Sequence, residues 1–125
     1  MKNVKQIRDQ IEKIEEAYEY MLAYAAQGRS DEGAGPDGAQ IRTFLKKFSE
    51  ALTKLDEATP DIVKENPAAV DFIEAFTSET KVMASILKVL LSRENISSEV
   101  IDNTNGLISV RAYLTSLFFL DKSIL

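Results

Sequence analysis

The sequence predicts an all-α protein, and more specifically a four-helix bundle with antiparallel up-down-up-down topology. Apolar residues recur at spacings of three and four in several long segments, which is the period of an amphipathic helix. Segments that contain glycine or proline separate them, as turns do. The chain has 125 residues, of which 45% are hydrophobic and 28% charged, as in an ordinary globular domain. We therefore expect one helical domain that spans residues 1–125.

The first helix is predicted over residues 3–27. Its apolar stripe, at heptad spacing, is Val4, Ile7, Ile11, Ile14, Tyr18, Met21 and Ala25. Its solvated side includes Glu12, Glu15, Glu16 and Glu19. Gly28 can adopt the left-handed conformation that ends a helix. A second architecture remains open, in which this helix pairs with another copy as a coiled coil and a smaller helical domain is attached.

The second helix is predicted over residues 38–57. A glycine-rich loop precedes it, Asp37 occupies an N-cap position, and Gln40 follows at the spacing of a capping box. Its apolar stripe is Ile41, Phe44, Leu45, Phe48, Leu52 and Leu55. We expect Thr59-Pro60 to stop this helix, because proline disfavours helical geometry in the residue before it.

The third helix is predicted to begin at Asn66-Pro67 and to end near Glu94. Asparagine caps helices, and proline in the first helical position loses no hydrogen bond that the helix needs. The principal stripe is Ile73, Phe76, Thr80, Met83, Leu87 and Leu90, and Val82, Ile86 and Val89 widen it. A stripe of this breadth predicts contact with two neighbouring helices.

The fourth helix is predicted to begin after a serine cap at Ser97 or Ser98 and to be interrupted near Gly106. The residues before this glycine are weak helix formers, and glycine itself costs about 1 kcal/mol relative to alanine within a helix. One apolar stripe is Ile101, Ile108, Ala112, Thr115 and Phe119, and the other is Leu107, Val110, Leu114, Leu117 and Phe118. We expect a kink or a break at this point.

The composition argues against an enzyme, because the chain contains neither histidine nor cysteine. Without histidine there is no Ser-His or Cys-His nucleophile pair, no His-assisted zinc site and no Glu-x-x-His motif of di-iron bundles. Without cysteine there is no disulfide, thiol nucleophile or Cys-based metal site. We therefore predict no catalytic residue, no metal site and no cofactor.

The charge distribution argues against nucleic-acid and membrane partners. The net charge is −5, and no segment is strongly basic. The least charged stretch, Leu107 to Leu120, contains Arg111 and is shorter than the roughly 20 residues that span a bilayer. The N-terminus runs directly into a charged amphipathic pattern, without the apolar region of a signal peptide. We expect a cytoplasmic protein.

Two features suggest a protein–protein interface. Tyr20 and Tyr24 lie one turn apart beside the core stripe, where they either contact a partner or flank the core. Only three charged residues occur from Leu107 to Leu125, and a helix that is apolar all round must be buried all round. Either other segments of the chain cover it, or it lies in a homodimer interface, which we favour. The candidate interface residues are Tyr20, Tyr24, Val110, Tyr113, Leu114, Leu117 and Phe118.

Two functions remain. The first is a noncatalytic interaction module, such as an adaptor, assembly factor, regulator or small subunit of a complex, which binds an unidentified protein and also self-associates. The alternative is a bundle that holds a small apolar ligand or cofactor between its helices, or an enzyme that works without histidine. The side chains that would line such a ligand site are Phe44, Phe48, Phe76 and Met83, residue types that also fill ordinary cores.

Overall fold

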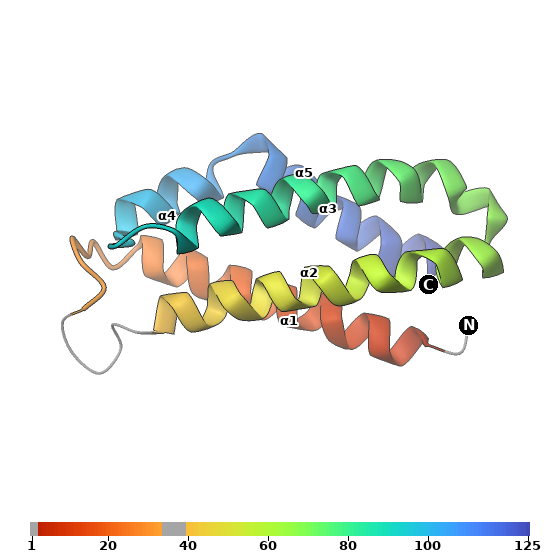
Figure 1. Cartoon of the computed structure of the whole chain (residues 1–125), viewed down its shortest axis with the longest axis horizontal. Helices are drawn as coiled ribbons and strands as arrows, with labels where there is room; N and C mark the ends of the chain where they lie inside the picture. Colours follow the sequence, from red (N-terminus) through yellow and green to blue (C-terminus); the bar gives the residue numbers. More distant parts are fainter. Residues whose placement is uncertain (1–2, 34–39) are drawn as a thin grey trace.

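The computed structural model describes residues 3–33 and 40–125 and shows an all-α protein, as predicted. The described residues form five α-helices and no strand (Figure 1). The helices are α1 (Val4–Ala25), α2 (Gln40–Glu65), α3 (Val70–Leu91), α4 (Ser98–Asn105) and α5 (Ile108–Phe119). A 3₁₀ turn, Pro67–Ala69, precedes α3, and a π-helical turn, Leu120–Ile124, follows α5. The predicted cap at Asp37 lies outside the described residues.

The core contains most of the apolar stripes predicted for the first three helices, but Val4, Tyr18, Ala25 and Phe44 are only partly buried. Residues of α4 and α5 complete it. All six residues of the principal α3 stripe are buried. In α1 the buried residues are Ile7, Ile11, Ile14, Ala17, Met21 and Tyr24. Because this α1 stripe is already packed inside the chain, the coiled-coil alternative has no support from the structure.

Each helix packs on particular neighbouring helices. Contacts join α1 to α2, α2 to α3 and α3 to α5, and α4 packs on α1. Helix α3 therefore has two neighbours, as the breadth of its stripe predicted. Few contacts join α1 directly to α5, although the two helices line one surface hollow and are bridged at one end. We call this loosely packed side the α1–α5 seam.

Helix α2 runs through Pro60, so the predicted stop at Thr59-Pro60 is wrong. Proline has no N–H, which leaves the Asp56 carbonyl without its usual helical donor. The Thr59 hydroxyl donates to that carbonyl at 2.8 Å and replaces the missing bond. The helix ends instead at Glu65, directly before the Asn66-Pro67 pair.

Two other helix ends fall close to their predicted positions. Helix α1 ends at Ala25, and Gly28 after it has φ of 65°, the left-handed conformation that the sequence predicts there. Helix α3 ends at Leu91, three residues before the predicted Glu94.

The predicted interruption near Gly106 is confirmed. Ser97 caps α4 by accepting a bond from the Val100 N–H at 3.2 Å, and α4 ends at Asn105. Leu107 is extended, with φ of −64° and ψ of 132°, so the chain changes direction before α5 begins. The break lets α4 pack on α1 while α5 packs on α3.

A membrane-spanning segment is not among the described helices: none combines the length and the apolar character that a bilayer crossing requires.

Candidate interaction surface

The seven residues predicted to form an interface do not share one surface. Four of them, Tyr24, Val110, Tyr113 and Leu117, are at most 2% exposed and belong to the chain's own core. Tyr20 and Leu114 are partly buried against that core. Phe118 alone of the seven is exposed, with 58% of its surface accessible.

The two buried tyrosines are held by hydrogen bonds inside the chain. The Tyr24 hydroxyl donates to the Ile96 carbonyl at 2.5 Å, and the Tyr113 hydroxyl lies 3.2 Å from the Thr80 hydroxyl. Burial raises the pKa of both phenols above the ordinary value near 10. A ring that packs in the core while its hydroxyl finds a partner is the usual arrangement of a buried tyrosine. These two side chains therefore stabilise the fold and are not available on the surface.

Tyr20 belongs to the packing of α1 on α2. Its ring stacks on Phe44, with centroids 4.2 Å apart, and the Lys47 ammonium lies 5.2 Å from the centroid of the Phe44 ring. This stack uses the face of Tyr20 that a partner would otherwise contact.

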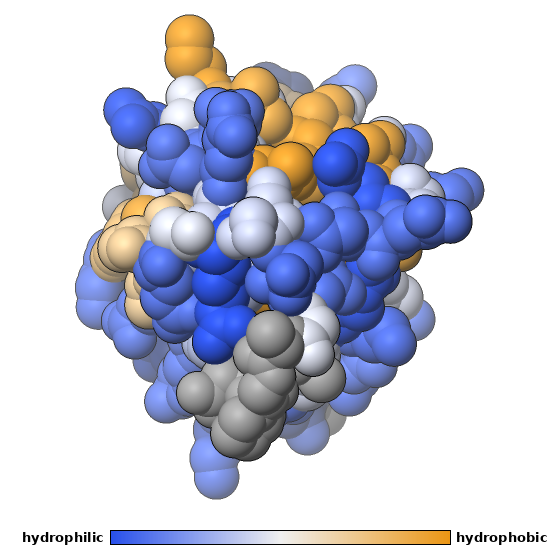
Figure 2. Space-filling view, turned by 90° about the vertical axis from the view of Figure 1, so that its left-hand side faces the viewer, coloured by the Kyte–Doolittle hydropathy of each residue, from blue (hydrophilic) through white to orange (hydrophobic). Residues whose placement is uncertain are grey.

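Large apolar side chains are exposed on α5 and on the neighbouring part of α3. The most exposed is Ile108, at 84%. Figure 2 views the molecule from the left-hand side of Figure 1, and there hydrophobic surface lies at the top, above a mostly hydrophilic face. The other exposed apolar residues of α3 and α5 are Val70, Val82, Val89, Phe118 and Phe119. Leu107, directly before α5, is exposed as well. Of the predicted apolar set Ile101, Ile108, Ala112, Thr115 and Phe119, only Ile101 is buried and the other four are exposed. The Phe119 ring packs on Phe72 of α3, with centroids 4.9 Å apart. Because α5 is apolar on nearly all sides and packs on only one of them, part of its apolar surface stays uncovered.

A hollow of about 630 Å³ opens at one end of the α1–α5 seam. Helix α1 contributes Tyr18 and Leu22, α4 contributes Asp102, Asn103 and Asn105, and α5 contributes only Arg111, with Leu107 between α4 and α5. Leu22 and Leu107 are 47% and 43% exposed. The sequence analysis missed Leu22, because it lies outside the heptad stripe and one exposed leucine carries no signal by itself.

The inner wall of this hollow contains a polar group without a partner. The Asn105 side chain is 6% exposed, and its Nδ2 donates to the Met21 carbonyl at 3.2 Å. Its Oδ1 has no hydrogen-bond partner within the described residues. Arg111 Nε donates to the Asn105 backbone carbonyl at 3.4 Å, which holds the guanidinium at the edge of the hollow.

Both walls of the seam carry mixed charge, since Arg8 lies on the α1 wall and Asp121 follows α5 on the other. Glu15 lies on the α1 wall near Asp121 and Lys122, and Glu19 follows one helical turn later on the same face. Partial desolvation raises the pKa of Glu15, with smaller contributions from Asp121, Glu12 and Glu19, and Lys122 offsets these only in part. On the other wall, α5 has a single charged residue, Arg111.

At the far end of the seam, away from the hollow, an ion pair bridges α1 and the turn after α5. Arg8 Nε donates to Asp121 Oδ1 at 2.9 Å, and half of the Arg8 side chain is exposed. An exposed pair of this kind contributes about 1 kcal/mol at most, so it closes the seam only weakly.

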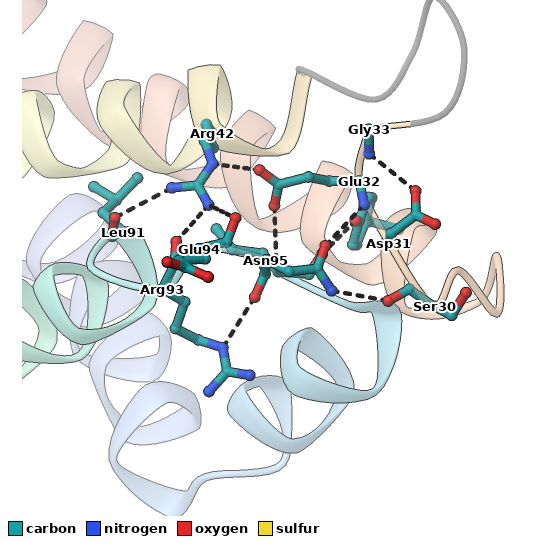
Figure 3. Close-up of polar contacts among 11 residues, drawn as sticks. Ser30, Asp31, Glu32, Gly33, Arg42, Leu91, Arg93, Glu94 and Asn95 are labelled. Carbon is teal, nitrogen blue, oxygen red and sulfur yellow. Dashed lines mark hydrogen bonds and ion pairs between the residues drawn. The ribbon is translucent and has the colours of Figure 1, made fainter.

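A second polar cluster joins the loop after α1 to the turn between α3 and α4 (Figure 3). Arg42, in the first turn of α2, pairs with Glu32 and donates to the carbonyls of Leu91, Arg93 and Glu94. The Glu32 carboxylate also accepts from the Ile96 N–H at 2.7 Å. We call this cluster the Arg42 clasp.

The Arg42 clasp has a structural explanation. A guanidinium at the end of α3 satisfies carbonyls that have no partner within the helix, where the helix dipole also favours a cation. The Asn95 side chain adds bonds to the Ser30 carbonyl and the Glu32 N–H, at 2.8 and 3.1 Å. Because its donors and acceptors are already used within the chain, the clasp is a less suitable binding site than the seam.

Within the described residues, no group of three or more Asp or Glu side chains is arranged to hold a metal ion. No protein-family model, no curated protein and no solved structure matches this chain.

Proposed function

We propose that this protein is a noncatalytic protein–protein interaction module that self-associates as a homodimer through α5. The observation that carries the proposal is the exposure of Ile108, Phe118 and Phe119 on one short helix. Large apolar patches that remain exposed on a monomer commonly mark sites of association.

The energetics favour association through this helix. Complete burial of a large apolar side chain contributes roughly 1.5 to 3 kcal/mol, and each of these three side chains is half exposed or more. In a two-fold interface every residue is used twice, so a few such residues on each copy suffice to offset the entropic cost of dimerisation.

We also propose that α4 and α5 together form the fourth member of an antiparallel up-down-up-down bundle in a cytoplasmic protein. Successive long helices alternate in direction in Figure 1, which supports this topology. The absence of cysteine is consistent with a reducing compartment.

The alternative function, a small apolar ligand held between the helices, has less support. The side chains that would line such a site are already packed against other residues: the Phe76 ring stacks with Phe72 and Tyr113, with centroids 5.9 and 5.3 Å apart. Phe48 and Met83 are at most 1% exposed in the same core.

Light scattering coupled to size exclusion, over a range of protein concentrations, tests self-association. We expect a mass of twice the 13.9 kDa of one chain, and a shift to monomer when Phe118 and Phe119 are both replaced by serine. Val70→Ser is the matched control, because Val70 is 48% exposed but lies outside α5. A wild-type protein that stays monomeric at every concentration would contradict self-association.

A further inference from the structure

We infer that the homodimer forms through the outer face of α3 and α5, with α3 of one copy antiparallel to α3 of the other and a two-fold axis that passes beside Val82. The inference rests on the proposed self-association and adds the surface, the symmetry and the register of the interface. We call this surface the α3–α5 face. Its large apolar residues, all exposed or partly buried, are Phe72, Val82, Ile86 and Val89 of α3 and Ile108 and Phe119 of α5.

Two contacts show how α5 lies against α3. The centroids of the Phe119 and Phe72 rings are 4.9 Å apart, and nearer the middle of both helices the Ser116 hydroxyl donates to the Glu79 carboxylate at 3.0 Å. Residue numbers fall along α5 as they rise along α3, so the two helices are antiparallel. Because Ile108 lies eleven residues before Phe119, it lies just past the middle of α3.

The outer side of α3 has a pattern that is symmetric about Val82. Steps of three and four residues lead from Val82 to Ser78 and Ala75 in one direction and to Ile86 and Val89 in the other, so the five side chains share one face. In an antiparallel pair about Val82, Ala75 lies opposite Val89 and Ser78 lies opposite Ile86. Each small side chain then faces a larger one, which is how the ridges of one helix fit the grooves of another.

Charge is divided along α3 in the way that an antiparallel pair requires. The three acidic residues of this helix precede its two basic residues, in the order Asp71, Glu74, Glu79, Lys81 and Lys88. Asp71 and Arg93 lie eleven residues to either side of Val82, which is close to three helical turns, so they occupy the two ends of the face. The antiparallel pair places Asp71 of each copy opposite Arg93 of the other, and the symmetry forms this pairing twice. Glu94, beside Arg93, is the acidic exception at the basic end.

The part of α5 that adjoins α3 has no charge. It consists of Ile108, Ala112, Ser116 and Phe119, which share one side of the helix by their spacing. The charged groups of α5 and of the turn after it lie toward α1: Arg111 lines the hollow beside α1, and Asp121 pairs with Arg8 of α1 and with Lys122. A second copy can therefore cover this part of the face without burying a charge of α5.

The size of the face predicts a weak dimer. Helices of 22 and 12 residues, such as α3 and α5, are about 33 and 18 Å long and about 10 Å wide, so the face measures roughly 500 Å² in projection. A standard interface buries about 800 Å² on each partner, and weak ones bury less than about 600 Å². We therefore expect a dimer that dissociates on dilution.

The other two-fold arrangement fits this face less well. An axis parallel to the helices would place α3 of one copy over α5 of the other. Arg93 would then lie over a helix without a carboxylate, and the small residues Ala75 and Ser78 would no longer face Val89 and Ile86. Charge and shape therefore both favour the antiparallel pair.

An engineered disulfide tests the register, because the chain has no cysteine of its own. We expect Val82→Cys to form an intermolecular disulfide under mild oxidation, since the axis brings the two copies of this residue together and a disulfide needs Cβ atoms about 4 Å apart. Val70→Cys is the matched control. Val70 and Val82 are valines of one helix with 48% and 49% exposure, but they lie about 120° apart around it. Non-reducing electrophoresis over time compares the two variants.

Charge reversal at the ends of the face tests the antiparallel arrangement. We expect Asp71→Lys and Arg93→Glu each to weaken dimerisation about tenfold, because each places like charges opposite each other twice. An equimolar mixture of the two variants should recover dimers, since each altered end then meets the opposite charge. Glu57→Lys, an exposed reversal on α2, is the control and should leave the dissociation constant unchanged.

Sedimentation velocity on the wild type, the charge variants and the mixture, with circular dichroism to verify the fold, gives the dissociation constants. A wild-type dimer in which Val82→Cys forms a disulfide no faster than Val70→Cys would overturn the axis beside Val82 and leave self-association intact. Two weakened charge variants whose mixture stays dissociated would overturn the antiparallel arrangement. A wild-type protein that is monomeric at every concentration would overturn self-association itself, and this inference with it.

Discussion

The Arg42 clasp and the α1–α5 seam are two places where segments distant in the sequence meet, and they are built in opposite ways. In the clasp, one guanidinium contacts a carboxylate, the carbonyl of the last residue of α3 and two carbonyls of the turn that follows. Across the seam, one half-exposed ion pair bridges α1 to the turn after α5, while Leu22 and Leu107 reach solvent and Asn105 Oδ1 has no partner.

The difference indicates in which part of the surface the side chains already have their contacts within one chain. Polar groups that have found partners gain little from a second molecule, whereas exposed apolar side chains gain from being covered. We therefore expect substitutions in the clasp to lower stability, and substitutions of the exposed seam residues to leave stability nearly unchanged.

The largest effect on stability is expected for Arg42→Ala in the clasp. The variant loses the pairing with Glu32 and the donors to three carbonyls, and hydrogen bonds to charged groups contribute about 1.5 to 3 kcal/mol each. We expect the free energy of unfolding to fall by about 3 kcal/mol in urea titrations, with no change in oligomeric state. Arg93→Ala is the control, since the exposed Arg93 guanidinium donates to the Asn95 carbonyl at 3.1 Å, and it should cost less than about 1 kcal/mol. Equal losses in the two variants would contradict the role of the clasp.

Alkaline pH should produce the next largest effect, through the two buried tyrosines. Burial raises the pKa of Tyr24 and Tyr113 in the folded state, so above pH 10 the unfolded chain loses these protons first. The stability that they provide is present below about pH 10 and is lost as the pH rises further. We expect a loss of about 1 to 2 kcal/mol between pH 10 and pH 11, measured by urea titration at each pH. Tyr113→Phe should reduce this slope, and an unchanged slope would refute the assignment.

Tyr24→Phe should have a smaller effect, because it removes one hydrogen bond beside the clasp. The Ile96 carbonyl loses its phenolic donor inside the core, and the expected cost is about 1 to 2 kcal/mol. Tyr18→Phe, on a partly buried tyrosine that lines the seam hollow, should cost less than about 0.5 kcal/mol. Thermal unfolding of the two variants compares them, and a larger loss for Tyr18→Phe would reverse the interpretation.

The smallest change in stability is expected in the seam. Leu22→Ser together with Leu107→Ser removes two exposed apolar side chains, and surface substitutions of this kind usually stay within about 0.5 kcal/mol. Urea titration of the double variant and the wild type gives the comparison, and a loss of several kcal/mol would show that the two leucines belong to the folded core.

Periodicity alone predicted the helices and most of the core. The α3 stripe from Ile73 to Leu90 is buried as predicted, because a spacing of three and four places these residues on one face of a helix. The break at Gly106 was also predicted, since weak helix formers cluster before it. These features depend on neighbours in the sequence, which is why local patterns are sufficient to find them.

Other features need information that these patterns lack. Helix α2 continues through Pro60, where the Thr59 hydroxyl bonds the Asp56 carbonyl, although proline usually ends a helix at the preceding residue. The positions of Tyr24 and Tyr113 in the core depend on Ile96 and Thr80, which lie 72 and 33 residues away along the chain.

The sequence by itself determined the helical class, the core stripes and the excess of apolar residues in the last helix. Only the tertiary structure decided which of those apolar residues are covered. Val110 and Leu117 are buried, whereas Ile108 and Phe118 on the same helix reach solvent. The physical reason is that a period records which residues share a face, but the packing of the other helices decides which faces are occupied.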